Sequence, residues 1–177
     1  MIADSSAIIL FARLNRIQLL KKLYGYIEVA ESVYEESVEK GAEYGYGDAI
    51  ILKKAFKEGL LKKTGLSRQH KELAANLQQA HPQLGKGEAD TIALAIQNKS
   101  RAALIDEHAA RIAARLQGVK CTGSIGIFLL AFSKGMMSEN EAKALLNTAL
   151  KESFRISSAI VMEFYDALDR IKRKKGR

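Results

Sequence analysis

Residues 87–122 read GEADTIALAIQNKSRAALIDEHAARIAARLQGVKCT, and the alternating pattern of this stretch decides the fold class. The apolar-rich segment 88–98 predicts a buried helix, and the apolar run 102–105 predicts a buried strand. A second helix is predicted at 107–117 and a second short strand at 119–122. Strands separated by single helices indicate an α/β protein with a parallel sheet and right-handed crossovers.

The same alternation extends to both sides of this stretch. Further strands are predicted at 2–3, 26–29 and 60–64. Helices are predicted at 7–14, 17–24, 32–39, 48–57, 67–79, 124–134, from the capping residue Ser138 onward, and at 157–173. Segment 41–47 contains three glycines and two tyrosines and is predicted to be a loop. Since no repeat or linker divides the chain, we expect a single domain over 1–177 that ends in a frayed basic tail at 170–177.

The composition is that of an ordinary globular protein with a preference for polyanionic partners. Of the 177 residues, 47% are hydrophobic and 27% are charged. The formal net charge of +8 favours partners such as nucleic acid. The single cysteine, Cys121, excludes an intrachain disulfide and fits a reducing compartment. No segment has the length of a membrane span or the pattern of a signal peptide, so we expect a cytoplasmic protein with no membrane partner.

Four acidic positions fall where an α/β chain would form one metal site. Asp4 and Asp106 directly follow predicted strands, and residues at the carboxyl ends of parallel strands line a shared ligand crevice. Glu36 and the Glu88/Asp90 pair lie in predicted helices that can lean over this crevice. Because clustered carboxylates repel one another they need a cation, and their oxygen atoms suit Mg²⁺ or Mn²⁺. The pattern is typical of a metal-dependent phosphodiesterase.

Most of these acids also have a purely structural alternative. Asp4 can cap the helix that follows it, and first-turn acids such as Glu88 and Asp90 favour the helix dipole. Most acids of segment 31–39 are expected on a solvated face. Glu36 is the exception, because it lies beside the buried stripe of its helix and is expected to point inward.

Polar residues beside these acids are candidates for supporting roles: Ser5, Ser6 and Glu107. The two serines can hold the preceding carboxylate by hydrogen bonds. Asp106 is hard to explain by packing, because it follows the most apolar predicted strand. Arg111 and Arg115 share one face of the following helix, where they either contact phosphates or pair with Glu107.

Four motifs, in this order along the chain, resemble those of the PIN-domain ribonucleases: IADSS at 2–6, VYEE at 33–36, GEAD at 87–90 and LIDE at 104–107. The likeness is greatest to the VapC-like toxin branch, in which Leu-Gly-x-Gly-Glu-Ala precedes an apolar helix. The corresponding segment here is LGKGEA at 84–89. The segment FRIS at 154–157 also resembles that branch, so the resemblance covers nearly the whole chain.

This resemblance implies a PIN-like three-layer α/β/α fold, with a central parallel sheet ringed by helices, and Mg²⁺- or Mn²⁺-dependent cleavage of RNA. By position, it implies catalytic acids at Asp4, Glu36, Glu88 and Asp106. The metal ligands would be Asp4, Glu88, Asp90 and Asp106. The resemblance further implies a homodimer and a small antitoxin protein that blocks the site. Contacts with RNA or with this antitoxin would come from Arg111 and Arg115.

Three function hypotheses follow from the residues and the resemblance. The first is an endoribonuclease toxin of a type II toxin–antitoxin pair, in which metal ions activate a water molecule. The second is a housekeeping PIN nuclease that processes RNA without an antitoxin. The third, a non-catalytic RNA-binding PIN domain, is disfavoured because no acid of the set is missing. A phosphatase that forms an aspartyl phosphate would require an acid in place of Ser6.

Overall fold

The computed structural model of the protein describes residues 1–100, 102–152 and 156–175. The chain forms two compact units, Met1–Gly123 and Ser124–Arg177. Residues 154 and 155 of the FRIS segment, and residues 176 and 177 of the basic tail, lie outside the described residues. The first unit carries all the acids of the predicted site.

A five-stranded parallel sheet forms the centre of the first unit. Its strands are β1 (Ile2–Ala3), β2 (Ile27–Ala30), β3 (Leu61–Thr64), β4 (Ala102–Leu104) and β5 (Lys120–Thr122). Across the sheet their order is β3-β2-β1-β4-β5, and each neighbouring pair is parallel. The chain therefore builds outward from β1 to β3 and then crosses to the other side of β1. In open sheets ligands bind where the strand order reverses, which is here at the carboxyl ends of β1 and β4.

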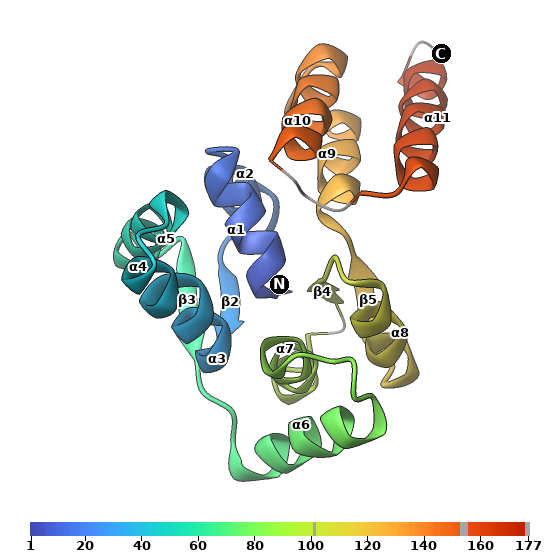
Figure 1. Ribbon diagram of the computed structural model, residues 1–177. Coiled ribbons are helices and arrows are strands. Elements are labelled where there is room, and N and C mark those ends of the chain that lie inside the picture. The colour runs from blue at the N-terminus through green and yellow to red at the C-terminus, as the bar shows by residue number, and fades with distance from the viewer. Residues whose placement is uncertain (101, 153–155, 176–177) are drawn as a thin grey trace. The chain divides into compact units, whose positions relative to one another are not determined.

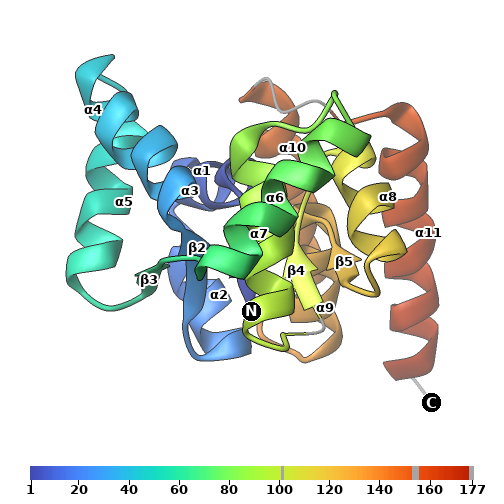
Figure 2. The same ribbon diagram turned by 90° about the horizontal axis from the view of Figure 1, so that it is seen from below.

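Helices cover both faces of this sheet (Figure 1). On one face lie α1 (Ser5–Arg13) and α2 (Ile17–Tyr24), and on the opposite face lie α6 (Arg68–Ala80) and α7 (Lys86–Gln97), as Figure 2 shows from below. In addition, α5 (Gly47–Lys57) packs on α1, and α8 (His108–Leu116) packs on β5 and α7. The predicted parallel sheet flanked by helices is confirmed.

The segment after β2 departs from the prediction. It runs as one continuous helical stretch through α3 (Glu31–Tyr34), the π-helix η1 (Glu35–Lys40) and α4 (Gly41–Glu43). The predicted loop at 41–47 is therefore wrong for its first three residues. Gly41 is buried and has helical backbone angles (φ −57°, ψ −39°), so this glycine does not end the helix as the sequence suggested.

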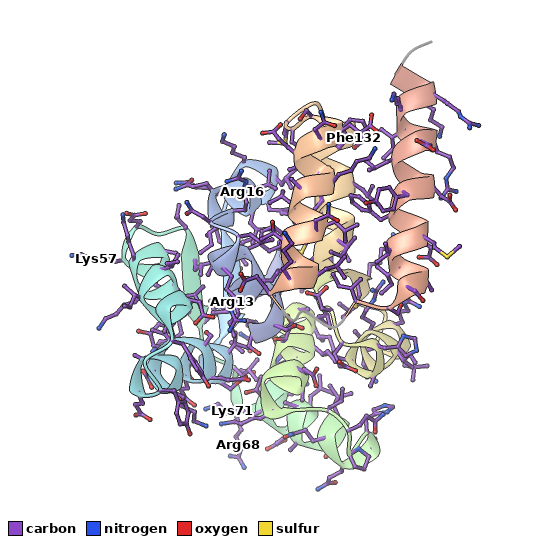
Figure 3. All side chains as sticks on the ribbon, turned by 45° about the horizontal axis from the view of Figure 1, so that its top comes forward. Arg13, Arg16, Lys57, Arg68, Lys71 and Phe132 are labelled. Carbon is purple, nitrogen blue, oxygen red and sulfur yellow. The ribbon has the colours of Figure 1, made fainter. Side chains whose placement is uncertain are left out.

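An apolar core fills the space between the sheet and its two helical layers. Ile2, Val29 and Leu104, on three neighbouring strands, are fully buried. An ion pair of 2.6 Å, between Arg13 Nε and Asp48 Oδ2, joins α1 to α5. Figure 3 labels Arg13 between these helices. The Asp48 side chain is only 6% exposed, so removing the arginine would leave a buried charge without this partner.

The second unit contains, within its described residues, the helices α9 (Ser124–Ser133), α10 (Glu139–Lys151) and α11 (Ser158–Lys175). Ser138 and Glu141 form the predicted capping box of α10. The carboxylate of Glu139 joins α10 to α11, because it lies 2.6 Å from Lys143 Nζ and 2.9 Å from Lys172 Nζ. α11 continues through Lys175, within the segment for which the sequence predicted a frayed end. None of the helices in the described ranges combines the length and the apolar composition needed to cross a membrane.

Candidate active site

Asp4 lies directly after β1 and caps α1. Its Oδ1 atom accepts a hydrogen bond of 2.9 Å from the Ala7 amide and one of 3.0 Å from Ser6 Oγ. The residue is only 1% exposed. The capping role that the sequence offered as an alternative is therefore real, and it holds the carboxylate rigidly at the end of the strand.

The end of β4 brings Asp106 to the same place. The Asp106 amide donates a long hydrogen bond of 3.4 Å to Asp4 Oδ2. Burial and, second to it, the nearby charge of Asp106 raise the pKa of Asp4 to about 7, against the hydrogen bonds from Ala7, Ser6 and Asp106 that lower it. The two strand-end acids are thus brought together at the point where the strand order reverses, as expected for a ligand crevice.

A pocket of about 570 Å³ opens in front of Asp4 and is called the acid pocket below. Three chain segments form its walls: the start of α1, the helical stretch from α3 to η1, and the start of α7. Its lining residues are Asp4, Ser5, Ser6, Ser32, Glu35, Glu36, Lys40, Gly85, Lys86, Gly87 and Glu88. Three predicted acids and both predicted supporting serines therefore line one pocket.

Glu36 reaches this pocket over Gly87. A Cβ atom at position 87 would stand 3.1 Å from Glu36 Oε2 and 3.4 Å from Val33 Cγ2, so a side chain here would crowd the Glu36 carboxylate. Glu35 is exposed, as the sequence predicted, but Glu36 is exposed as well, so the two do not differ in burial as expected, and both line the acid pocket. The π-helical turn explains why both neighbours face the pocket, because its i→i+5 hydrogen bonds change the angular spacing of side chains.

Glu88 stands at the start of α7. Its Oε2 atom accepts a hydrogen bond of 2.8 Å from the Gly85 amide. Partial burial raises the pKa of Glu88, and the charges of Glu107 and Glu36 raise it further. The Glu88 carboxylate therefore lies close enough to other acids to feel their charge, while one of its oxygens caps α7.

Asp90, the other member of the predicted pair, lies in a different environment. Its Oδ2 atom accepts a hydrogen bond of 2.5 Å from Ser32 Oγ. It lines an adjoining hollow of about 370 Å³ rather than the acid pocket, although Ser32, Glu35 and Lys86 line both. The structure thus places Glu88, and not Asp90, in the pocket with Asp4.

The two predicted arginines of α8 lie near the end of β5. Arg111 Nη1 and Asp106 Oδ1 each stand 3.2 Å from the point where a Cβ atom would lie at Gly123, so both reach the same small space. Burial raises the pKa of the Cys121 thiol, whereas the charges of Arg111 and Arg115 lower it. The arginines therefore place positive charge beside the strand end that carries Asp106.

Three polar side chains of the pocket were not predicted from the sequence: Ser32, Lys40 and Lys86. Lys40 lies four residues beyond Glu36 in one helical stretch, and this spacing was a readable signal. Lys86 lies between two glycines, but the sequence around it lacks the full phosphate-loop pattern that would have predicted a phosphate contact. Ser32 had no local signal, because its hydrogen-bond partner Asp90 is 58 residues away.

The donor atoms of the site suit a hard divalent cation, although they do not form a closed metal shell. Among the described residues, no three side chains of His, Cys, Asp or Glu come together in a group that could hold a metal ion. Mg²⁺ usually keeps several waters and is bound by one or two carboxylates together with substrate phosphates. The buried Asp4 and the half-buried Asp106 fit this mode, because the charge of Asp106 raises the pKa of Asp4 and a cation would relieve that repulsion.

Comparison with protein families identifies the class to which this fold and site belong. A family model described as a PIN domain matches residues 1–170, which is nearly the whole chain. The chain therefore belongs to the PIN-domain family. PIN domains are generally nucleases that use divalent metal ions, so family membership supports a hydrolase that acts on nucleic acid. Searches of curated proteins and of solved structures find no match to this chain.

Proposed function

We propose that this protein is a metal-dependent endoribonuclease and the toxin of a VapC-like type II toxin–antitoxin pair. The observation that carries the proposal is the pairing of Asp4 and Asp106. The backbone amide of Asp106 donates to the Asp4 carboxylate at the switch point of the sheet, and burial together with the charge of Asp106 raises the pKa of Asp4 to about 7. Perturbed acids of this kind cluster at catalytic and metal sites.

The proposed cation is Mg²⁺ or Mn²⁺, held by Asp4 and Asp106 with help from Glu88. When bound, such a cation supplies positive charge to a phosphate and makes a water molecule more acidic. The hydrogen bonds that Ser6 and the Ala7 amide donate to the Asp4 carboxylate favour its charged form and oppose the rise in its pKa. Asp90 supports the site indirectly through Ser32, which lines the acid pocket.

The acid pocket also contains the charges that an RNA strand requires. Lys40 and Lys86 line it together with Glu36, so cationic side chains flank the carboxylates on both helical walls. Lysine ammonium groups bind phosphate oxygens, and the net charge of +8 attracts a polyanion from solution. We propose that Arg111 and Arg115 contact the RNA or the antitoxin on the Asp106 side.

The proposed partners are the RNA substrate, a second copy of the chain and a small antitoxin. An antitoxin would inhibit most directly by placing an arginine among the carboxylates, because the guanidinium group can bind a carboxylate through two hydrogen bonds. The support for the toxin assignment is the sequence resemblance together with the intact set of acids: Asp4, Glu36, Glu88 and Asp106.

The test is cleavage of a labelled RNA by the purified full chain. We expect cleavage with Mg²⁺ or Mn²⁺, none in excess EDTA, and a loss of at least about a hundredfold for Asp106→Asn. The matched control is Glu72→Gln, which removes an exposed acid of α6 that pairs only with Arg68 among the described ion pairs. Undiminished cleavage in EDTA would falsify the metal mechanism.

Growth distinguishes the toxin from the alternative nuclease. Expression of the protein alone should arrest growth, and expression of Asp106→Asn should not. If soluble, RNA-cleaving protein leaves growth unimpaired, the housekeeping PIN nuclease is the correct assignment.

A further inference from the structure

A second, chemically different depression lies at the edge of the sheet. The order of the strands leaves one side of β3 without a neighbour in the described sheet. Along this side runs a groove of about 680 Å³, called the β3-edge groove below, whose side chains include Tyr26, Tyr34, Phe56, Leu61, Lys62 and Lys63. None of its lining residues is acidic, in contrast to the acid pocket.

The groove combines exposed cations with aromatic rings. Lys62 Nζ lies 5.8 Å from the ring centre of Tyr26, and Lys63 Nζ lies 4.6 Å from that of Tyr34. Tyr34 is also supported by Phe56, whose ring meets it edge-on with centres 4.8 Å apart. Tyr26 is 51% exposed, so much of its ring remains open to a ligand.

This arrangement follows from the strand itself. Lys62 and Lys63 are consecutive residues of β3, so their side chains leave the strand on opposite faces. Both nevertheless line the same groove, because the groove follows the open edge of the strand rather than one face. Two cations therefore flank one open strand edge, with an aromatic ring beside each.

The groove lies next to the proposed catalytic site. Tyr34 ends α3, and Glu35 and Glu36 continue the same helical stretch as the first residues of η1. One helix, roughly 10–12 Å across with its side chains, therefore separates the groove from the acid pocket. A flexible strand bound at one of them can reach the other.

We propose that the β3-edge groove binds a single-stranded segment of the RNA substrate next to the bond that is cleaved. One base stacks on Tyr26, and Lys62 and Lys63 bind the neighbouring phosphates. Aromatic stacking next to lysines is the general way in which proteins hold single strands without reading their sequence. This inference rests on the proposed function, because it names how that function holds its substrate.

A peptide strand is the competing occupant, since an open edge strand can pair with another chain. The lysines of β3 disfavour it, because charged side chains on edge strands oppose strand pairing. The same lysines favour a polyanion. Charge complementarity therefore supports RNA over protein at this edge.

The test measures RNA binding separately from cleavage. Asp4→Asn protein in EDTA is titrated with a short fluorescent single-stranded RNA at several salt concentrations. Adding Lys62→Ala with Lys63→Ala should weaken RNA binding about tenfold. The slope of the logarithm of the binding constant against the logarithm of the salt concentration should fall in magnitude by about 1.4, or about 0.7 for each lost phosphate contact. The matched control is Lys134→Ala with Lys151→Ala, which removes two exposed lysines of the second unit.

Tyr26→Leu tests stacking. It should weaken binding of the single strand about tenfold, as expected for one lost base–aromatic contact, and leave binding of an abasic strand unchanged. An equal loss with the control lysine pair, or an unchanged salt slope in the groove variant, would overturn the proposal. Self-association through the edge with undisturbed RNA affinity would overturn it in favour of a protein strand.

The groove variants are then assayed with Asp4 intact and Mg²⁺ present. KM for RNA should rise about tenfold, in line with the loss of binding, while kcat stays near that of the unchanged protein. If the unchanged protein binds RNA through the groove but does not cleave it, the proposed nuclease function fails and the groove stands. If the unchanged protein cleaves RNA and the groove variants cleave it with the same KM, the nuclease function stands and the groove proposal fails.

Discussion

Asp4 in the first unit and Glu139 in the second are both carboxylates, yet their surroundings move their pKa values in opposite directions. Burial beside Asp106 raises the pKa of Asp4 to about 7. Hydrogen bonds from Lys143 and Lys172 lower the pKa of Glu139 to about 2. The first carboxylate opposes folding of the metal-free chain when it is charged, whereas the second supports folding. The comparison separates an acid whose surroundings disfavour its charge, as is common at catalytic and metal sites, from an acid whose surroundings stabilise its charge.

The largest effect on stability is expected from Asp4→Asn in metal-free protein. Because the folded-state pKa of Asp4 is raised, its stabilising contribution is present below pH 4 and is lost as the pH rises to about 7. Asparagine cannot become charged, so the variant does not lose stability as the pH rises in this range, and its side-chain oxygen can still cap α1. Above pH 7 the variant should therefore be more stable by on the order of a few kcal/mol.

The measurement is urea unfolding in EDTA at pH 4 and at pH 8. The gain should appear at pH 8 and be small at pH 4, apart from a modest loss at the long contact with the Asp106 amide. Equal effects at both pH values would contradict the assignment of a raised pKa. The same variant should lose RNA cleavage although its fold is more stable, so the loss of activity cannot be attributed to unfolding.

An intermediate effect is expected from Gly87→Ala, which acts on geometry rather than on charge. The added Cβ would approach Glu36 Oε2 to 3.1 Å, and the flexible glutamate rather than the buried Val33 should move. Cleavage should fall about tenfold, while stability changes by less than about 1 kcal/mol.

The matched control is Gly85→Ala, where the nearest atom, Glu88 Oε2, would be 3.6 Å away in ordinary contact. Cleavage by this control should stay close to that of the unchanged protein. If both alanine variants cleave equally well, the position of Glu36 does not matter for the reaction.

The smallest effect is expected from Glu139→Gln. Because the pKa of Glu139 is lowered in the folded state, its charged carboxylate stabilises the fold above about pH 4.5, and this contribution is lost as the pH falls toward 2. Because ion pairs at the surface contribute little, the melting temperature at pH 7 should fall only slightly, and less in high salt. Thermal unfolding at low and high salt measures this. A large or salt-independent fall would show that Glu139 acts by packing.

The sequence predicted the sheet and most helices because their signals are local. The apolar run 102–105 marked the strand β4, and the Ser138/Glu141 capping box marked the start of α10. The helical course of 41–43 was missed, because a glycine in a buried helix looks the same in sequence as a glycine that ends one. The β3 edge was not predicted either, since strand order depends on contacts between distant segments.

Within the candidate site, the positions of Asp4 and Asp106 directly after predicted strands were enough to predict that they lie close together. In the structure the Asp106 amide donates a hydrogen bond to the Asp4 carboxylate. The helical acids were harder to assign. Reasoning from 3.6 residues per turn separated Glu35 from Glu36, but a π-helical turn has no sequence signal and turns both toward the pocket. Ser32 and Asp90 bind each other across 58 residues, a pairing that no local pattern reveals.

The pairing of β1 with β4 also determines when the site can exist during synthesis. Asp4 and Asp106 are 102 residues apart in the chain. Contacts of this separation close a long loop and form late in folding. At a synthesis rate of roughly 5–20 residues per second, the growing chain carries Asp4 for several seconds before Asp106 has been made. The growing chain on the ribosome therefore contains Asp4 without its partner, and the two acids come together only after the segment that carries Asp106 has emerged and β4 has paired with β1.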